Sequence, residues 1–435
     1  MAVSGNELGL VKVGLLGCGT VGSGVVQILR DRAELIARRT GCDIRVRKIA
    51  VRDLADPRYV EVPDEMVTTR VEDVLGDPEL QVVVELIGGI EPARSFVMDA
   101  ISRGKHVVTA NKALMSTYGG EILEAAEQAG MDVLYEASVG GAIPIMHPLK
   151  EGLAGNSISR ILGVINGTTN YILTRMAEED MAFRAALSEA QRLGYAEANP
   201  ENDVEGRDAA AKIAIMASAA FNSRVHLEDV YTEGISRVTP ADIAYARELG
   251  YAIKLLAIAS DDESGISVRV HPTMIPLKHA LASVNDVFNA IFVEADAAGD
   301  LMFYGRGAGS LPAASAVVGD VIAIARNLRA GGREVGCTCF ATKRIKSMNE
   351  TVCRYYVLLD VPDRPGVLAQ IASVFGNNQV SIKSVIQHGG GTEARIMLVT
   401  HRVTEESMMA AIHSLMTLPV ISSIANVIRV EDEGD

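Results

Sequence analysis

The stretch DVEGRDAAAK, residues 203–212, places ionisable side chains at a spacing that a helix brings to one face. Glu205, Asp208 and Lys212 stand at i, i+3 and i+7, and the run IAIMASAA that follows carries no charge. An ammonium group can give a proton, or a nearby positive charge, to an oxygen that gains negative charge in a reaction. The spacing therefore indicates either a catalytic face on a buried helix or an Asp208–Lys212 salt bridge on a solvated one.

The length and composition of the chain limit the kinds of domain that can hold this helix. The chain has 435 residues, which predicts two or three domains, and 48% of them are hydrophobic. We find no apolar run of the roughly 18 residues that a membrane span needs and no secretory pattern at the amino end, so we expect a cytoplasmic protein. A formal net charge of −14 opposes binding to nucleic acid or to an anionic membrane. Small molecules are the expected partners.

The cysteines are Cys18, Cys42, Cys337, Cys339 and Cys353. Their odd number and scattered positions predict reduced thiols rather than a disulfide framework. No histidine or second cysteine pair stands at ligand spacing from Cys337-Thr-Cys339, so we expect no zinc site there.

A dinucleotide fingerprint opens the chain. Residues 10–16, LVKVGLL, predict a buried strand that runs into the turn GCGTVG and then a helix. In such a turn Gly17 allows the tight bend, Gly19 lets the backbone approach a pyrophosphate, and Gly22 lets the helix pack on the strand. Phosphate then meets the amino end of the helix. With a second strand expected at 43–51, this order predicts nucleotide binding.

The second strand ends in AVRDL, where such a domain reads the adenosine ribose. An acid there bonds the 2′-hydroxyl of NAD, whereas an arginine suits the 2′-phosphate of NADP. Arg52 and Asp53 leave both cofactors open, with the guanidinium favouring NADP.

Two further strands are expected at 81–88 and 106–112, and each runs into polar or glycine-rich residues. Ligands bind beyond the carboxyl ends of the strands in an open parallel sheet. Asn111 and Lys112 therefore stand where chemistry takes place. The alternative is that Asn111 only starts a helix and that Lys112 is an ordinary surface lysine.

Glycine-rich and polar stretches follow from about residue 136, namely YEASVGGAIPI, VINGTTNYIL and LGYAEANPEND. Glycines let backbone approach a ligand, while Thr168, Thr169 and Asn170 offer uncharged hydrogen-bond partners. These stretches predict a lined pocket, with ordinary turns between strands and helices as the alternative.

The carboxyl-terminal segment predicts a β-α-β-β-α-β module. It is preceded by an Ala- and Val-rich helix, about 310–328, that we expect to return to the nucleotide-binding domain, and by a glycine-rich linker. In chain order, the strands and helices of the module are expected at 354–361, 367–378, 380–387, 394–400, 404–416 and 420–430.

Taken together, these motifs resemble those of the homoserine dehydrogenase family, in the family's order and along almost the whole chain. They are the fingerprint Gly17–Gly22, TANK, EASVGGAIPI, INGTTNYIL, GYAEANP, DVEGRDAAAK and GAGSLPAASAVVGD. The resemblance implies interconversion of L-homoserine and L-aspartate 4-semialdehyde with NAD or NADP, in the biosynthesis of threonine, methionine and isoleucine. It also implies the single-function form, without an amino-terminal kinase domain.

The resemblance assigns roles to individual residues. Lys212 matches the family's proton donor and acceptor, Lys112 the second lysine beside the substrate, and Asp208 the aspartate near it. The substrate-binding residues that it implies are Glu197, which holds the amino group, Lys112, Asp203 and Thr168. The cofactor-binding residues expected from the fingerprint and the resemblance are Gly17, Gly19, Thr20, Val21, Gly22, Arg52, Lys112, Gly140, Gly307 and Gly309. A monovalent cation, usually sodium, is implied at Glu136, Val139, Gly141 and Ile143.

The turn DVPDRPGVL resembles that of an ACT domain, which implies an amino-acid effector, here L-threonine as a feedback inhibitor, and assembly into a homodimer or homotetramer. The expected effector residues are Asp363, Arg364, Pro365, Gly366 and Val367.

The expected fold class is α/β, in three parts with a linker. A Rossmann-type domain at 1–135, completed by a return helix at about 306–328, precedes an α+β catalytic and dimerisation domain at 136–305. A linker at 329–352 leads to a ferredoxin-like βαββαβ ACT domain at 353–435.

Two positions depart from the family pattern, and three other functions compete with it. Arg306 stands where many members of the family have proline, and Asn199 stands where an aspartate is common. Both departures bear on the exact positions of the site residues. Phosphoglycerate dehydrogenase needs a histidine relay that none of the eight histidines matches. Aspartate semialdehyde dehydrogenase needs a nucleophilic thiolate, and Cys18 lies inside the phosphate turn. A non-catalytic sensor would keep the glycine turn and the tail without needing Lys112 and Lys212.

Overall fold

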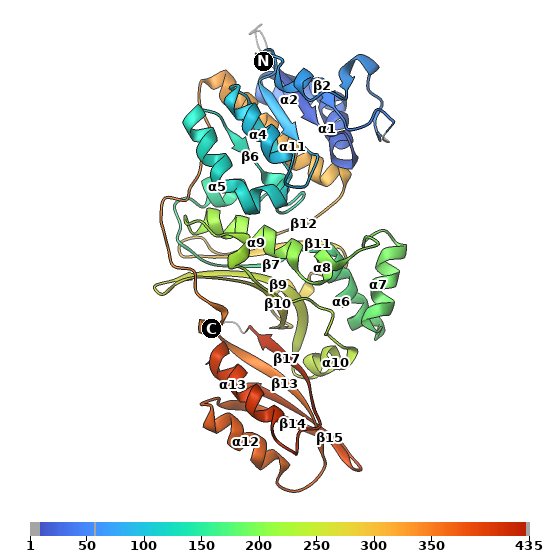
Figure 1. The fold of residues 1–435 in the computed structure, drawn as a ribbon, viewed down its shortest axis with the longest axis vertical. Coiled ribbons are helices and arrows are strands. Elements are labelled where there is room, and N and C mark those ends of the chain that lie inside the picture. Colours follow the sequence, from blue (N-terminus) through green and yellow to red (C-terminus); the bar gives the residue numbers. More distant parts are fainter. Residues whose placement is uncertain (1–8, 56–57, 432–435) are drawn as a thin grey trace. The chain divides into compact units, whose positions relative to one another are not determined.

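A computed structural model describes residues 9–55 and 58–431 (Figure 1). The chain divides into two compact units. One is formed by Met1–Ile158, Ala211–Leu227 and Glu294–Lys343, and the other by Ser159–Ala210, Glu228–Val293 and Arg344–Asp435. Residues 1–8, which hold most of the segment in which we found no secretory pattern, lie outside the described residues.

The first unit contains a six-stranded parallel sheet with the order β3-β2-β1-β4-β5-β6. The strands are β1 (Gly9–Leu16), β2 (Cys42–Ala50), β3 (Val67–Thr68), β4 (Val82–Glu85), β5 (His106–Thr109) and β6 (Val133–Leu134). This order is that of a Rossmann-type domain, so the predicted fold class is confirmed for this part of the chain. The order reverses between β1 and β4, which is where ligands bind in such sheets.

Helices connect these strands and cover the sheet. They are α1 (Thr20–Asp31), α2 (Ala33–Thr40), α3 (Glu72–Leu75), α4 (Ala93–Ser102) and α5 (Lys112–Ala129), joined from later in the chain by α11 (Ser310–Ala330). The part of α9 (Arg207–Ala220) from Ala211 on also belongs to this unit. The unit also contains the strand β12 (Gly299–Arg306) and the short turns η1 (Asp64–Met66), η2 (Glu136–Ser138) and η3 (Pro148–Gly152).

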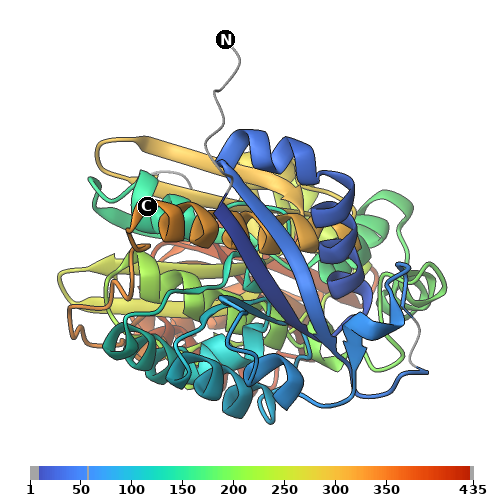
Figure 2. The same ribbon diagram turned by 90° about the horizontal axis from the view of Figure 1, so that it is seen from above.

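Helix α11 packs against α1, although nearly the whole sequence of the unit separates them (Figure 2). The approach is close because α1 has a glycine at the contact: a Cβ on Gly24 would lie 2.8 Å from the Cβ of Ala314. Among the described helices, α11 is also the one whose length and apolar composition would suffice to cross a membrane. Here its Val317, Val321 and Ile324 are fully buried in the core of the unit.

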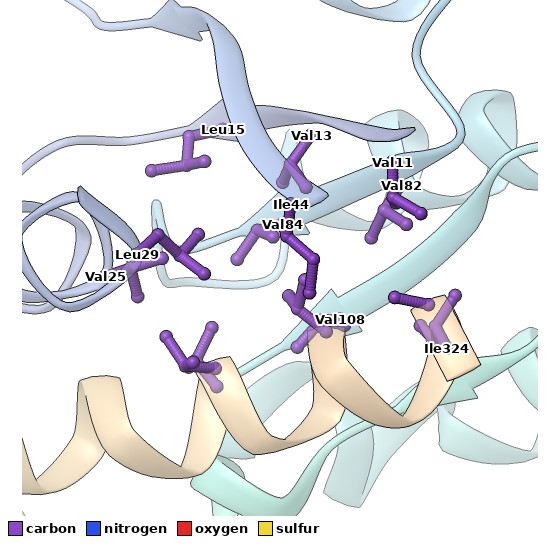
Figure 3. Packing of buried hydrophobic residues seen from close by; sticks show 14 of the residues in the cluster. Val11, Val13, Leu15, Val25, Leu29, Ile44, Val82, Val84, Val108 and Ile324 are labelled. Carbon is purple, nitrogen blue, oxygen red and sulfur yellow. The ribbon is translucent and has the colours of Figure 1, made fainter. Parts of the chain in front are cut away.

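The core of this unit is built from aliphatic side chains of the strands and of the helices α1 and α11 (Figure 3). Val13 and Leu15 of β1 are fully buried, as is Val25 of α1, and Ile324 of α11 belongs to the same cluster. Burial of one such side chain contributes about 1.5–3 kcal/mol, so many of them together fix the glycine turn that follows β1. The runs VVVE in β4 and HVVT in β5 are buried on both faces, which is typical of parallel strands.

The second unit contains a mixed sheet with the order β11-β7-β9-β10-β17-β13-β15-β14. The strands are β7 (Ile158–Val164), β9 (Tyr251–Asp262), β10 (Gly265–Pro276), β11 (Phe288–Ala295), β13 (Val352–Pro362), β14 (Ile382–Gly390), β15 (Glu393–Thr400) and β17 (Ser423–Val430), with the short β8 (Tyr231–Thr232) and β16 (Val403–Thr404) beside them. The helices and helical turns are α6 (Gly167–Glu179), α7 (Phe183–Arg192), α8 (Glu201–Val204), α10 (Pro240–Glu248), α12 (Val367–Asn377), α13 (Glu405–Met416), η4 (Leu227–Asp229), η5 (Ala280–Ser283) and η6 (Met348–Glu350).

The carboxyl-terminal part has the predicted β-α-β-β-α-β order, and the ACT-type fold is confirmed. Its strands pair antiparallel in the order β17-β13-β15-β14, with α12 and α13 packed on one hydrophobic cluster. Strand β17 also pairs in parallel with β10 at Thr273–Arg429 and Met274–Val430, so the module continues the sheet of its unit.

A buried ionic network lies at this junction. Arg429 on β17 is 5% exposed and donates to both carboxylate oxygens of Glu405, at 2.9 and 2.5 Å. It also donates to Glu233 at 2.7 Å and to the Tyr231 hydroxyl at 3.2 Å. Because Glu405 begins α13, the network ties a helix of the module to the chain that follows α9.

Lys254 on β9 gives the second unit a pH-dependent stability. Its buried ammonium donates to Val284 O at 2.6 Å, Asn285 Oδ1 at 2.9 Å and Asn170 Oδ1 at 3.2 Å. Burial lowers the pKa of Lys254 from 10.5 to about 8. Between these values the unfolded chain binds more protons than the folded one, so this group makes stability rise with pH, by up to about 3 kcal/mol.

We therefore expect Lys254→Met to reduce the rise of unfolding free energy across that pH window. Denaturant titrations of both proteins at several pH values measure it. An equal rise in both proteins would show that Lys254 titrates normally in the folded state.

Candidate active site

Asp208 and Lys212 lie one turn apart on α9 and are buried, with exposures of 3% and 8%. The alternative of a solvated salt bridge is therefore wrong. A buried carboxylate and a buried ammonium are costly to desolvate, so their presence on a helix that is otherwise apolar indicates a site.

Glu205 does not share this face, which corrects the predicted stripe of three. It follows the last residue of α8, and Gly206, with φ +80°, separates it from the start of α9. The i, i+3, i+7 spacing assumed one continuous helix, and a glycine in the left-handed region interrupts it.

Asn166 holds Asp203 and Asp208 together. Its side-chain amide nitrogen donates to Asp203 Oδ1 at 2.7 Å and to Asp208 Oδ2 at 2.9 Å. Its oxygen caps α6 by accepting from the backbone N–H of Thr169 at 2.9 Å. Asn166 was not predicted as a site residue from the sequence. Its position just before a helix is the pattern that could have marked it, because a capping asparagine has a fixed orientation.

Two other expected substrate residues, Thr168 and Glu197, lie on α6 and in the loop after α7. Thr168 follows Asn166 on α6, is 9% exposed, and donates to Tyr195 O at 2.6 Å. Glu197 and Asn199 lie in the exposed loop between α7 and α8. The carbonyl of Glu197 accepts from Gln191 Nε2 at 3.0 Å, and its carboxylate faces solvent.

The glycine turn after β1 has the geometry of a phosphate cradle. Gly17 has φ +100°, and a Cβ there would lie 2.9 Å from Leu86 O. A Cβ on Gly22 would lie 2.5 Å from Gly17 O, so only glycine lets α1 pack against the turn. A Cβ on Gly19 would meet no described atom within 4 Å, which leaves open space where a pyrophosphate would lie. Gly19 caps α1 without a side-chain hydrogen bond, so the first N–H groups of the helix can bind an anion.

We expect Gly19→Ala to raise KM for the dinucleotide about tenfold, or ~1.4 kcal/mol, because the added methyl would occupy the pyrophosphate position. The melting temperature should not change, since the methyl meets no atom of the described residues within 4 Å. Gly332→Ala, whose Cβ also faces open space, is the matched control. Unchanged KM in Gly19→Ala would place the cofactor elsewhere.

A network of polar side chains shapes the loops beyond β4 and β5. The carboxylate of Glu85, fully buried, accepts from the N–H groups of Ile87 and Gly88 at 2.9 and 3.2 Å and from Thr109 Oγ1 at 2.6 Å. Glu85 was also missed, although an acid within the run VVVE is itself unusual. Asn111 caps α5 and donates to Gly89 O at 2.6 Å.

Lys112 follows as the first residue of α5 and is half-buried. The helix-start reading of Asn111 is thus correct, and it places Lys112 at the carboxyl edge of the sheet, where ligands bind.

The loop that precedes α11 lies against the glycine turn. Ser310 Oγ donates to Thr20 O at 2.6 Å, which brings Gly307 and Gly309 to the start of α1. Gly309 has φ +130°. A Cβ on Gly141 would collide with the carbonyl of Gly307, so the loop around Gly140 lies beside it as well. Val21 packs on the core, and the exposed Arg306 accepts a hydrogen bond at its carbonyl from Ala142 N at 3.1 Å.

Arg52 and Asp53 follow β2 and are both exposed. Asp53 Oδ1 accepts from Ala55 N at 2.9 Å, a local turn contact. Both residues stand just after β2, where a Rossmann-type domain reads the adenosine ribose.

The expected cation loop has one carboxylate and several carbonyls. Glu136 is 4% exposed, and its carboxylate accepts from the N–H groups of Ile145, Met146 and His147 at 2.5, 2.8 and 2.9 Å. These bonds engage its side chain, and its carbonyl, which accepts from Val139 N at 3.4 Å, is the group that would face an ion. The carbonyls of Val139, Gly141 and Ile143 accept no hydrogen bond from the described residues, as expected for oxygens that ligate a cation.

The expected effector turn, Asp363–Val367, connects β13 and α12. Gly366 has φ +88° and caps α12, and Val367 is buried. Asp363 Oδ1 accepts from Gln387 Nε2 on β14 at 3.3 Å. Arg364 and Pro365 are exposed between them.

Three family models match successive parts of the chain. Residues 17–136 match the model described as homoserine dehydrogenase, NAD binding domain. Residues 144–322 match the model described as homoserine dehydrogenase. Residues 355–415 match the model described as ACT domain.

Curated proteins are similar to the chain over nearly its whole length. The homoserine dehydrogenase of Corynebacterium glutamicum is 47% identical over 426 residues, which cover 97% of this chain and 96% of that protein. The homoserine dehydrogenase of Bacillus subtilis is 43% identical, with 98% and 99% covered.

Solved structures give the same result. The crystal structure of a homoserine dehydrogenase from Thiobacillus denitrificans has a TM-score of 0.94 and 45% identity, and covers 98% of this chain and 100% of that one. A hyperthermophilic archaeal homoserine dehydrogenase in complex with NADPH has a TM-score of 0.64 and 25% identity, and covers 75% of this chain and 99% of that one.

Proposed function

The chain belongs to the homoserine dehydrogenase family, and from that premise we propose which of its residues carry the reaction and its control. The enzyme is an oxidoreductase with an NAD-binding domain and an ACT domain. The family match disfavours the rival dehydrogenases and the sensor. The observation that carries our assignment is the buried pair Asp208 and Lys212 on α9, with Asp208 held by Asn166.

Lys212 transfers the proton in this proposal. When L-homoserine is oxidised to L-aspartate 4-semialdehyde, the hydroxyl proton moves to Nζ of Lys212, directly or through a water. In the reverse direction the ammonium gives it back to the oxygen, where negative charge develops. Asp208, one turn earlier on the same helix, orients the ammonium, and Asn166 fixes the carboxylate of Asp208 through its amide.

The substrate is bound by groups of both signs. In this proposal Glu197 holds its amino group, Lys112 is the second lysine beside the substrate, and Asp203 and Thr168 also bind it. The exposed carboxylate of Glu197 suits this role, because a loop that carries it can close on a bound amino acid.

The glycine turn fits a nicotinamide dinucleotide, because Gly19 faces open space at the free amino end of α1. When bound, the nicotinamide accepts or donates the hydride. We propose NADP as the preferred form, since Arg52 follows β2 and a guanidinium suits a 2′-phosphate; the archaeal relative is described in complex with NADPH. Rates with NADP and NAD in parallel test this, and Arg52→Ala should remove the preference for NADP.

A monovalent cation, sodium, fits the carbonyls of Glu136, Val139, Gly141 and Ile143, three of which accept no hydrogen bond from the described residues. Its role would be to hold the loop around Gly140, which lies beside Gly307. Melting temperatures in sodium and in a bulky organic cation test it; equal values would contradict the site.

The ACT domain takes L-threonine as a feedback inhibitor in this proposal. The amino end of α12, capped by Gly366, offers N–H groups to a carboxylate, and Asp363 offers an acceptor to an ammonium. Paired modules would make the enzyme a homodimer or homotetramer, and the reduced thiols suit the cytoplasm.

The test is a titration of the enzyme with threonine while rate and mass are recorded. We expect inhibition in the wild type and a higher half-inhibiting concentration in Asp363→Ala. No change in either rate or mass would refute this control.

A further inference from the structure

Two of the cysteines share a small pocket at the end of α9 that the reaction does not use. Cys337 and Cys339 are in the irregular segment after α11, are partly exposed and carry free thiols. With Ser218, Arg224 and Tyr135 they line a pocket of about 30 Å³, which is room for a molecule the size of water or hydrogen peroxide.

The two thiols have different surroundings. Arg224 Nη2 lies 3.6 Å from Cys337 Sγ, and Lys150 on η3 adds a second positive charge. Contact with Cys339 and these cations lower the pKa of Cys337 below its ordinary range. Cys339 donates instead to Ser218 O at 3.5 Å, and its contact with Cys337 and its burial raise its pKa. The buried Tyr135 also borders the pair.

We propose that Cys337 and Cys339 are a thiol–disulfide pair that small hydroperoxides oxidise, with Cys337 as the attacking thiolate and Cys339 as the resolving thiol. A thiolate beside a guanidinium is the nucleophile that such chemistry needs, and a second thiol in contact with it is the group that completes a disulfide. Disulfides of this kind in a reducing compartment are transient and regulatory.

The chemistry balances in two steps. Cys337 sulfur attacks one peroxide oxygen, the O–O bond breaks, and the other oxygen leaves as an alcohol or water after taking a proton, so that Cys337 becomes a sulfenic acid. Cys339 sulfur then attacks Cys337 sulfur, the S–O bond breaks and water leaves. Two thiols have together given two electrons to one hydroperoxide. A dithiol reductant reverses the reaction by exchange.

The segment that holds the two cysteines is hydrogen-bonded to α9 and to the residues just after it, so its oxidation would change these contacts. Thr338 Oγ1 donates to Ala219 O at 3.4 Å, and Ala341 N donates to Asn222 O at 2.9 Å. The disulfide would remove the bond from Cys339 to Ser218, on the helix that carries Lys212.

One tryptic peptide makes the test direct. Cleavage after Arg333 and Lys343 releases EVGCTCFATK, which contains both cysteines and none of the others. Full-length reduced enzyme is treated with hydrogen peroxide, and the remaining thiols are alkylated. The protein is then digested with trypsin, and the mass of the peptide is measured by mass spectrometry. We expect it to lose the mass of two hydrogens and to regain it with dithiothreitol. The buried Cys42 and Cys353 are internal controls that should stay reduced.

Variants separate the two roles. Cys339→Ser should stop at the sulfenic acid, which dimedone traps on Cys337, whereas Cys337→Ser should leave Cys339 unreactive. Arg224→Gln should slow alkylation of Cys337 at about pH 6 on the order of tenfold. A peptide that keeps both thiols when Cys42 or Cys353 oxidises, or a Cys337→Ser variant that reacts as fast as the wild type, would overturn the proposal.

Discussion

Replacing Lys212 by methionine is expected to lower kcat for homoserine oxidation by about 10²–10⁴-fold. Methionine has a similar length and suits a buried position, since Lys212 is 8% exposed, but it can neither take nor give a proton. The variant should still bind the dinucleotide, because the glycine turn lies on other elements of the chain. Steady-state rates with saturating cofactor, and cofactor binding by fluorescence, measure both properties.

Lys105→Met is the matched control for this prediction. Lys105 is also buried, at 3% exposure, and its ammonium donates to Leu80 O at 3.0 Å, but it lies before β5 at the amino end of the strands. Its removal should lower stability and leave kcat unchanged. Equal losses of kcat in both variants would mean that burial of a lysine, rather than proton transfer, explains the effect.

Replacing Arg429 by methionine is expected to reduce the free energy of unfolding by about 3–5 kcal/mol. The change leaves the carboxylates of Glu405 and Glu233 without the guanidinium that now donates to both. An uncompensated buried charge costs more than the loss of one ordinary contact. Because the chain contains no tryptophan, denaturant unfolding is best followed by circular dichroism.

The control for Arg429 is an exposed arginine in the same module. Arg395 pairs with Asp360 at 3.0 Å, but the side chains are 47% and 34% exposed. Arg395→Met should cost at most about 1 kcal/mol, since solvent screens the pair. If the two variants are destabilised equally, the network at the junction of β17 and α13 does not have the importance that we give it.

The nucleotide-binding half was predictable because the strand, the glycine turn and the helix that identify it are adjacent in the sequence. A glycine turn between a buried strand and a helix has one common use. Gly17 and Gly22 leave no room for a Cβ, while Gly19 faces open space. The short strands β3 and β6 were not foreseen, since two residues show no periodicity.

The candidate site was predictable only in part. The burial of Asp208 and Lys212 follows from the apolar helix that carries them, but Gly206 breaks the helix that the spacing of Glu205 assumed. Asn166 is 42 residues from Asp208 in sequence, and only the folded chain brings the two together. The same holds for Cys337 and Arg224, which are 113 residues apart.

The central claim is that Lys212 moves the proton in the oxidation of homoserine. The most direct measurement is the absorbance of reduced nicotinamide when L-homoserine and NADP are added to the wild type and to Lys212→Arg. Arginine keeps the positive charge but does not lose its proton, so we expect homoserine-dependent reduction by the wild type and about 1% of that rate or less in the variant. A variant as fast as the wild type would contradict proton transfer by Lys212, and a wild type that reduces no cofactor would contradict the reaction itself.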